Sequence, residues 1–200
     1  MSLSGVRVLD FSRVLAGPYC SLMLAELGAD VIKVEEPGTG DESRGWPPFI
    51  KGQSGYFFSV NRSKRSIAMN LKKEEAKRII RELTAKSDVV LENFAPGVTK
   101  RLGIDYETLR AINPRIIYCS VSGFGQTGPL RDKRAYDPIL QAMSGIMSVT
   151  GSRGGEPVKC GVAITDVASA MIAAFSIAVS LYRREKTGKG QYIDLAMLDT

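Results

Sequence analysis

The chain has 200 residues, of which 44% are hydrophobic and 24% are charged, and it carries a formal net charge of +6. This length can bury one full-sized core, and the composition excludes a disordered or low-complexity chain. Lys and Arg are spread out, with no dense basic run interleaved with aromatics, so the charge favours a phosphate-bearing small molecule over nucleic acid.

Predicted strands and helices alternate along the chain. Apolar runs predict buried strands over residues 6–11, 30–35, 66–71, 88–93, 115–124 and 191–198. Helical periodicity and start signals predict helices over residues 18–27, 72–86, 106–113, 138–144 and 167–184. Residues 37–55 are rich in Gly and Pro and predict a long loop. This alternation is typical of the α/β class, with a mostly parallel sheet and flanking helices.

The apolar run 167–182 is the one segment that could be mistaken for a membrane span. It has sixteen residues, contains three serines and directly follows Asp166. A bilayer needs about 20 apolar residues, so the run predicts a buried core helix and no membrane partner. The three cysteines are scattered without metal spacing, which indicates reduced thiols and a cytoplasmic protein, or one of the mitochondrial matrix in a eukaryote.

The chain contains no histidine. Within these residues, this excludes a Ser-His-Asp or Cys-His nucleophile, a histidine general base and a histidine-liganded metal. Any chemistry of these residues must therefore use carboxylates, lysines or tyrosines.

Three turns are candidate ligand sites. Residues 12–18, SRVLAGP, follow the first strand, where doubly wound folds bind nucleotides, but they do not match the G-x-G-x-x-G fingerprint. The loop 38–46 either presents backbone amides and Arg44 to an anion or is an ordinary solvated loop. Residues 92–97, ENFAPG, end another strand and are either a ligand-binding edge or ordinary turn chemistry.

The predicted function depends most on Asp166, and its position in the sequence leaves two roles open for the carboxylate. Directly before a helix that begins at Val167, its carboxylate can accept hydrogen bonds from the free backbone amides as a cap. An ionised carboxylate at a helix start is also a competent nucleophile toward activated acyl groups and can form a covalent intermediate.

Five collinear stretches carry a resemblance to a known family. They are GVRVLDFSRVLAGPYCSLMLAELGADVIKVEEPGTGDESRGW, NRSKRSIAMNLK, ENFAPGVTKRLG, RAYDPILQAMSGIMSVTG and GVAITDVASAM. Together they resemble the N-terminal half of the class III CoA-transferases, the CaiB/BaiF family. Within that family, the stretches YCSVSGFGQTGP and KTGKGQYIDLAML are most similar to the succinyl-CoA:dicarboxylate (glutarate-type) enzymes.

The resemblance implies a Rossmann-like large domain that binds CoA, with residues 1–200 as its N-terminal segment. Family members are longer, so the rest of the large domain and a small domain are expected to be absent from this chain. The resemblance also implies an interlocked homodimer, with CoA as a substrate and with no tightly bound cofactor or metal.

The resemblance further implies CoA transfer from an acyl-CoA donor to a carboxylic acid through a covalent intermediate on the catalytic residue Asp166. The implied CoA-binding positions are Leu15, Ala16, Met69, Asn70, Leu71, Lys72, Asn93, Phe94, Ala95, Arg101, Arg134, Ala135, Tyr136 and Asp137. Lysine and arginine suit the phosphates of CoA, and Met69 and Phe94 suit its adenine or pantetheine surface.

The chain departs from the pattern of oxalate/formyl-type members at two positions, and two other functions are open alternatives. Oxalate/formyl-type members carry glutamine where this chain has Leu15 and arginine where it has Glu36, so oxalate is not the expected acid. A 2-methylacyl-CoA racemase is one alternative; its histidine aligns with Tyr136, and tyrosine is a poor base near neutral pH. A non-catalytic CoA- or nucleotide-binding chain is the other.

Overall fold

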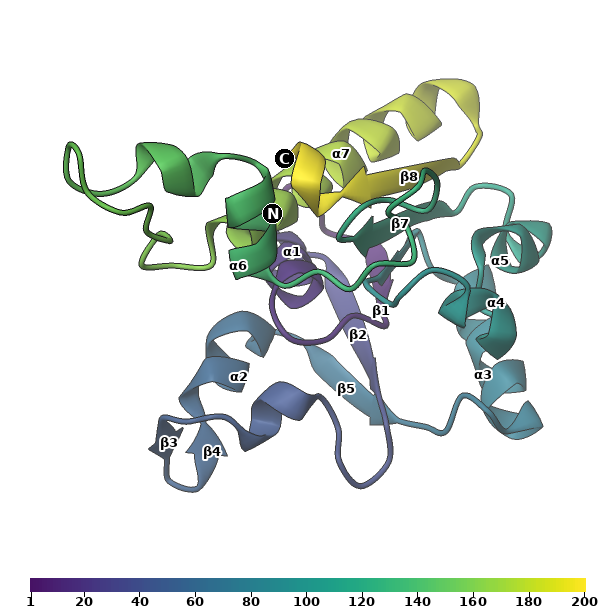
Figure 1. Ribbon diagram of the computed structural model, residues 1–200. Coiled ribbons are helices and arrows are strands. Elements are labelled where there is room, and N and C mark those ends of the chain that lie inside the picture. Colours follow the sequence, from purple (N-terminus) through teal and green to yellow (C-terminus); the bar gives the residue numbers. More distant parts are fainter.

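The structure is a computed structural model that describes residues 1–200. Six parallel strands form one sheet in the order β5-β2-β1-β6-β7-β8 (Figure 1). The strands are β1 (Arg7–Asp10), β2 (Asp30–Glu35), β5 (Arg65–Ala68), β6 (Val89–Glu92), β7 (Ile117–Ser122) and β8 (Gln191–Ala196). Every neighbouring pair is parallel, which confirms the predicted α/β class.

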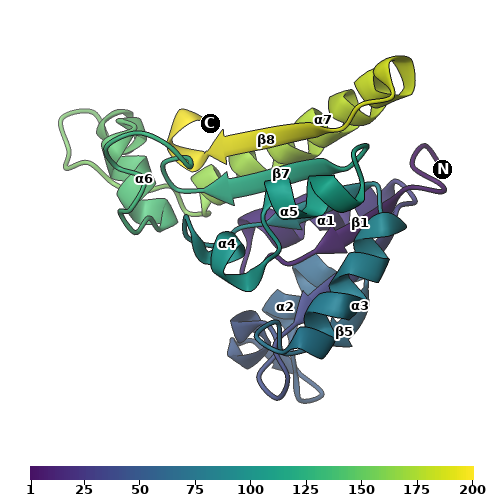
Figure 2. The ribbon, with the colours of Figure 1, turned by 90° about the vertical axis from the view of Figure 1, so that its right-hand side faces the viewer.

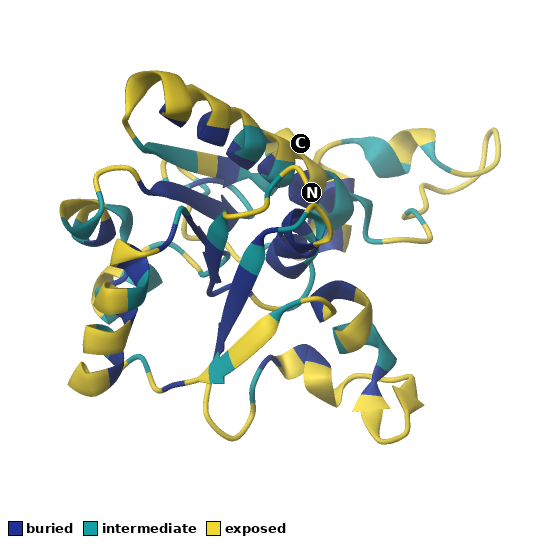
Figure 3. Ribbon diagram, turned by 180° about the vertical axis from the view of Figure 1, so that it is seen from behind, coloured by how far each residue is buried: buried dark blue, intermediate teal, exposed yellow.

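Helices cover both faces of this sheet (Figure 2). One face is covered by α1 (Ala16–Glu26) and α7 (Ile164–Thr187), and the other by α3 (Glu74–Ala85), α4 (Val98–Leu102) and α5 (Tyr106–Ile112). Side chains alternate between the faces along each strand, so Val8 packs under α1 while Leu9 joins the opposite core. Since both faces are covered, the central strands are almost entirely buried (Figure 3).

The segment predicted as a long loop is more ordered than expected. It contains a 3-10 helix, η1 (Glu42–Gly45), and a two-stranded hairpin of β3 (Phe49–Ile50) and β4 (Gln53–Ser54). The helix α2 (Gly55–Asn61) follows at once, and the Ser54 side chain caps it by accepting the N–H of Phe57 at 3.1 Å. The Gly and Pro residues that predicted a loop act here as turns between very short elements.

A second long segment outside the sheet connects β7 to α7. It contains α6 (Asp137–Met143) and the 3-10 helix η2 (Ile146–Val149), and it projects from the sheet in Figure 1. A last 3-10 helix, η3 (Met197–Asp199), follows β8 and packs against both α6 and α7.

One helix, α7, is long and apolar enough to cross a membrane, with a mean hydropathy of 1.8 over its most apolar window. Its inner side, including Ala170, Ala173 and Ile177, is buried against the sheet and α1. The predicted core helix is therefore confirmed, although its outer side carries exposed apolar residues such as Phe175 and Tyr182.

Candidate active site

A pocket lies at the carboxyl edge of the sheet, beside the point where the strand order reverses. From β1 the chain continues to β2 and β5 on one side, while β6, β7 and β8 lie on the other. The loops after β1 and β6 therefore part here and leave a crevice, which is where open parallel sheets bind ligands. This pocket has a volume of about 570 Å³, and residues that follow β1, β2, β5 and β6 line it.

The pocket brings together half of the predicted CoA-binding set from three parts of the chain. These residues are Met69, Asn70, Leu71 and Lys72 after β5, Phe94 and Ala95 after β6, and Arg101 in α4. The lining is part apolar and part charged, and of its cations, Lys72 and Arg101 form no ion pair within the protein.

The short helix α4 presents Arg101 to this pocket. It has five residues, and both flanking residues, Gly97 and Gly103, have left-handed backbone conformations, with φ of 79° and 69°. Other residues rarely adopt this conformation, so the Pro-Gly turn of ENFAPG is needed to begin the helix here. The segment forms a turn, as one of the two sequence alternatives has it, and its residues Phe94 and Ala95 also line the pocket, so ligand binding at this edge stays a prediction.

Asn93 ties the two sides of the crevice together. Its Oδ1 accepts the backbone N–H of Arg13 at 2.9 Å, and its Nδ2 donates to the carbonyl of Arg13 at 2.8 Å. Two residues after Arg13, Leu15 is the N-cap of α1, and Ala16 is the first residue of that helix. These three predicted positions border the pocket-lining residues without lining the pocket themselves.

The remaining predicted positions lie at the start of α6 and do not line this pocket. Arg134, Ala135 and Tyr136 lead into the helix, and the Tyr136 ring is 71% exposed. Asp137 is the first residue of α6 and is only 8% exposed, with its carboxylate held inside the protein.

A buried ion pair that the sequence analysis missed supports the loop after β1. Lys33 Nζ lies 3.0 Å from Asp41 Oδ2, and both side chains are almost fully buried. Lys33 also donates to the carbonyl of Ser12 at 2.6 Å, and Asp41 accepts the N–H of Val14 at 3.3 Å. Burial alone would raise the pKa of Asp41, but Lys33 and Ser43 outweigh it and lower that pKa.

Arg44 is not free to bind an anion. Its Nε and Nη2 donate to the two carboxylate oxygens of Glu35 at 2.7 and 2.8 Å, and its guanidinium lies 3.8 Å from the ring centroid of Phe57. Burial alone would raise the pKa of Glu35, but hydrogen bonds from Arg44 and Ser66 outweigh it and lower that pKa to about 2. Arg44 and Asp41 therefore attach this loop to the sheet, while most of its residues remain exposed to solvent, as in the ordinary solvated loop of the sequence analysis.

A row of polar side chains crosses three strands under the turn after β6. Glu92, Ser120 and Asp194 lie abreast on β6, β7 and β8. Glu92 accepts a hydrogen bond from Ser120 and, at 2.8 Å, the backbone N–H of Phe94. Burial raises the pKa of Glu92 to about 7. This carboxyl group holds the turn that carries Phe94 and Ala95 into the pocket.

Asp166 does not cap a helix. The helix α7 begins at Ile164, three residues earlier than predicted, so Asp166 is the third residue of its first turn. Asp137 caps the helix instead. Its Oδ1 accepts hydrogen bonds from the Thr165 N–H at 2.9 Å and from the Thr165 hydroxyl at 2.7 Å. The prediction that α7 begins at Val167 is wrong, because a carboxylate 28 residues away supplies the cap.

The Asp166 carboxylate is half-buried and accepts no hydrogen bond and no ion pair from the protein. Burial, with a smaller contribution from the like charge of Asp137, raises the pKa of Asp166 to about 6. Tyr56 of α2 lies near enough for the two groups to interact, and burial and the Asp166 charge raise the pKa of Tyr56 to about 12. Because neither carboxylate oxygen is engaged within the protein, the group is chemically able to act as a nucleophile.

Comparisons with known proteins decide the family. The family profile described as "CoA-transferase family III" matches residues 3–200.

The chain belongs to CoA-transferase family III.

This family III chain is similar to enzymes with different acid substrates. It is 50% identical to succinyl-CoA:glutarate CoA-transferase of Mus musculus over 99% of this chain and 46% of that protein. It is 48% identical to succinate–glutarate CoA-transferase of Agrobacterium fabrum, over 98% of this chain and 51% of that protein. It is also 50% identical to acetyl-CoA:oxalate CoA-transferase of Acetobacter aceti, over 98% of this chain and 50% of that protein.

A solved structure agrees with the assignment to CoA-transferase family III. The crystal structure of a CaiB/BaiF family protein from Brucella suis superposes with a TM-score of 0.94 at 46% identity, over 98% of this chain and 53% of that one. The Rossmann-like CaiB/BaiF fold predicted from the resemblance is thus confirmed. The chain spans about half the length of the curated relatives it matches.

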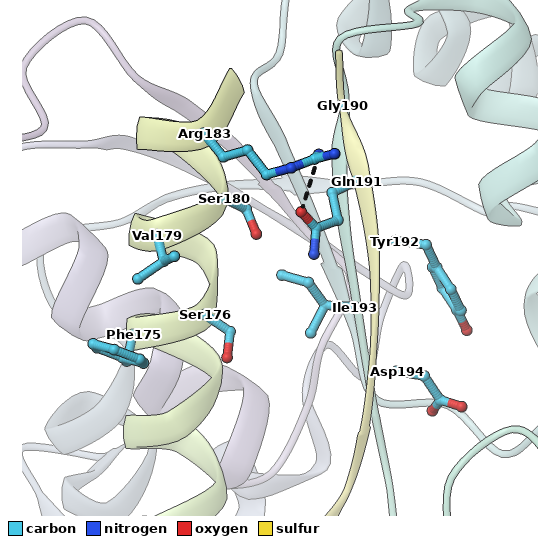
Figure 4. Close-up of a pocket in the computed structure, with 10 residues that line it drawn as sticks. All are labelled: Phe175, Ser176, Val179, Ser180, Arg183, Gly190, Gln191, Tyr192, Ile193 and Asp194. Atoms are coloured by element: carbon cyan, nitrogen blue, oxygen red, sulfur yellow. Dashed lines mark hydrogen bonds between the residues drawn. The ribbon is translucent and has the colours of Figure 1, made fainter. Parts of the chain in front are cut away.

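A second hollow of this CoA-transferase chain lies on its outer side, between α7 and β8 (Figure 4). It has a volume of about 780 Å³, and Phe175 and Val179 of α7 line one wall. In Figure 4, Gln191 and Ile193 point from β8 toward α7, while Tyr192 and Asp194 point to the other face. No predicted CoA-binding residue and no part of the Asp166 surroundings line this groove.

Proposed function

We propose that the chain transfers CoA from an acyl-CoA donor to a carboxylic acid through a covalent intermediate on Asp166. One observation carries this proposal. Asp166 is a half-buried carboxylate with no hydrogen-bond or ion-pair partner, so neither oxygen is committed to holding the fold. Above its pKa of about 6 the group is ionised and nucleophilic.

In the proposed mechanism, an Asp166 oxygen attacks the thioester carbonyl of the donor. The C–S bond breaks, CoA leaves as a thiolate, and a mixed anhydride joins the acyl group to Asp166. The thiolate then attacks the aspartyl carbonyl, which releases the donor acid and leaves Asp166 as a CoA thioester. The acceptor carboxylate displaces CoA from Asp166, and the returning thiolate attacks the acceptor carbonyl, which frees Asp166 and gives the new acyl-CoA.

We propose the pocket at the strand-order reversal as the nucleotide end of the CoA site. Its apolar lining residues suit the adenine, and the unpaired cations Lys72 and Arg101 suit phosphates. Arg134, exposed before α6, is proposed as a further phosphate contact.

The acceptor is proposed to be a dicarboxylic acid of the glutarate type, as in the mouse and Agrobacterium relatives. The equal identity to an acetyl-CoA:oxalate enzyme makes oxalate the first competitor to include in a substrate screen. No observation favours the racemase alternative, because the Tyr136 hydroxyl has no hydrogen-bond partner that could accept its proton.

Trapping the intermediate tests the covalent mechanism. The full-length protein is incubated with succinyl-CoA and then with hydroxylamine, and its peptides are examined by mass spectrometry. The expected result is one aspartyl hydroxamate, on the peptide that contains Asp166, and none when CoA replaces succinyl-CoA. If no adduct forms on this peptide while CoA still binds, the non-catalytic binding protein is the correct reading.

The full-length protein is proposed to be a homodimer with interlocked subunits. Large apolar side chains remain exposed on the outer side of α7 and on the segments between β2 and β5 and between β7 and α7, which favours their burial in an assembly. They include Ile50, Phe58, Val149, Phe175 and Tyr182. We expect gel filtration to give a dimer that survives dilution to nanomolar concentration, whereas a stable folded monomer would refute interlocking.

A reducing compartment, cytoplasm or mitochondrial matrix, is proposed from the three free cysteines.

A further inference from the structure

A buried polar network joins α6 to the start of α7. Asp137 Oδ1 accepts both the N–H and the hydroxyl of Thr165, while Oδ2 accepts Gln141 Nε2 at 2.5 Å. Gln141 Oε1 in turn accepts the N–H of Cys160 at 2.7 Å. The three side chains of Asp137, Gln141 and Thr165 are all buried. One network therefore holds the segment that enters α7 and the first turn itself.

We propose that Asp137 is a positioning residue for Asp166, acting through its two hydrogen bonds to Thr165. Thr165 directly precedes Asp166 in the first turn of α7. The Asp166 side chain has no hydrogen bond of its own, so its place depends on the backbone of that turn. The inference rests on the proposed function of Asp166, and it gives Asp137 a part different from the CoA contact implied by the family resemblance.

The burial of Asp137 argues against direct contact with a ligand. It is 8% exposed, and both of its carboxylate oxygens are engaged within the protein. A ligand would have to displace Thr165 or Gln141 to reach them. The positioning part needs no such rearrangement, because the carboxylate already contacts the residue next to Asp166.

The network also sets the charge environment of Asp166. The neighbouring titratable groups are Asp137 on α6 and Tyr56 on α2, and both interact with it. Of the other elements packed on α7, α1 offers Tyr19 but no charged residue before its end, and η3 offers the exposed Asp199. The strand β7 offers only Tyr118 and Cys119, and Asp194 of β8 points to the other face (Figure 4). No cation pairs with Asp166, so burial and, to a smaller extent, the charge of Asp137 raise its pKa without opposition.

The test measures kcat, KM for the acyl-CoA donor and the pH profile of the full-length protein. For the wild type, the activity is expected to rise with pH through about 6, because only ionised Asp166 attacks. Asp137→Asn keeps an acceptor oxygen for Thr165 but removes the charge, so the acid limb of the pH profile should move to lower pH.

Asp137→Ala removes both the acceptor and the charge. The same limb shift is expected, together with a roughly tenfold loss of kcat and a nearly unchanged KM, because the nucleophile is displaced while the CoA pocket is intact. A raised KM with wild-type kcat and limb would make Asp137 a CoA contact and overturn the inference. Wild-type kcat and limb in Asp137→Asn would overturn it as well, even if the alanine variant fails to fold.

Asp105 provides the matched control. It accepts the N–H and hydroxyl of Thr108 at the start of α5, as Asp137 does for Thr165, but outside the site. Asp105→Asn and Asp105→Ala should lower stability without changing kcat or the acid limb.

A readout without activity separates this inference from the proposed function. The ¹³C shift of the Asp166 carboxyl should titrate at lower pH in Asp137→Asn than in the wild type, whether or not Asp166 is a nucleophile. If that titration is unchanged, the positioning inference fails; if Asp166→Asn keeps its activity, the proposed function fails instead.

Discussion

Asp166→Asn is expected to reduce the turnover of the full-length protein by roughly 10⁴-fold or more. An amide cannot form the anhydride with the donor acyl group, so the first covalent step is lost. The wild-type carboxylate makes no hydrogen bond, and removing a charge beside Asp137 relieves like-charge repulsion. The free energy of unfolding at neutral pH should therefore not decrease. Steady-state assays and denaturant unfolding measure the two quantities.

The matched control for this substitution is Asp132→Asn, which removes the same charge from an exposed position next to Arg131. We expect it to keep wild-type kcat. Retention of wild-type turnover by Asp166→Asn would end the covalent mechanism. A loss of turnover together with unfolding would be distinguished by the unfolding measurement, and Asp166→Ser would then serve as the smaller replacement.

Arg101→Ala is expected to weaken CoA binding by roughly 10- to 150-fold, corresponding to the loss of a charge-assisted hydrogen bond of about 1.5–3 kcal/mol. The Arg101 guanidinium has no partner in the protein, so its removal leaves no buried charge behind and should not affect stability. The salt dependence of binding should also become flatter, because one phosphate contact is lost. Isothermal titration with CoA at several salt concentrations measures both effects.

Lys100→Ala is the control for Arg101. It removes the same charge from the same helix, α4, but Lys100 does not line the pocket. A long-range effect of net charge would weaken binding equally in both variants, whereas a direct contact weakens only Arg101→Ala. Unchanged affinity of Arg101→Ala across the salt series would remove Arg101 from the site.

The sheet and its helices could be predicted because their signals are local. A strand buried on both faces is mostly apolar, and β2, β6 and β7 each lie within the predicted ranges. The pocket residues after β5 and β6 were found through the family resemblance, and their common place follows from parallel strands ending at one edge.

The start of α7 could not be predicted, because its cap is not local. A capping residue normally lies next to the helix it caps, and Asp166 fits that rule by position. In the fold, Asp137 reaches Thr165 from another helix, which allows α7 to begin earlier and leaves Asp166 free. Tyr56 was missed because it interacts with Asp166 from α2, a helix that the sequence analysis did not predict.

Val14, in the loop after β1, has a consequence for the energetics of binding. Its backbone φ is 70°, a conformation that costs a β-branched residue on the order of 1–3 kcal/mol. The buried Asp41 accepts the N–H of Val14. The folded protein therefore keeps Val14 in this strained conformation without the help of a ligand. The loop is therefore preorganised, and the CoA nucleotide that is proposed to bind beside it would lose little affinity to the entropy of ordering it.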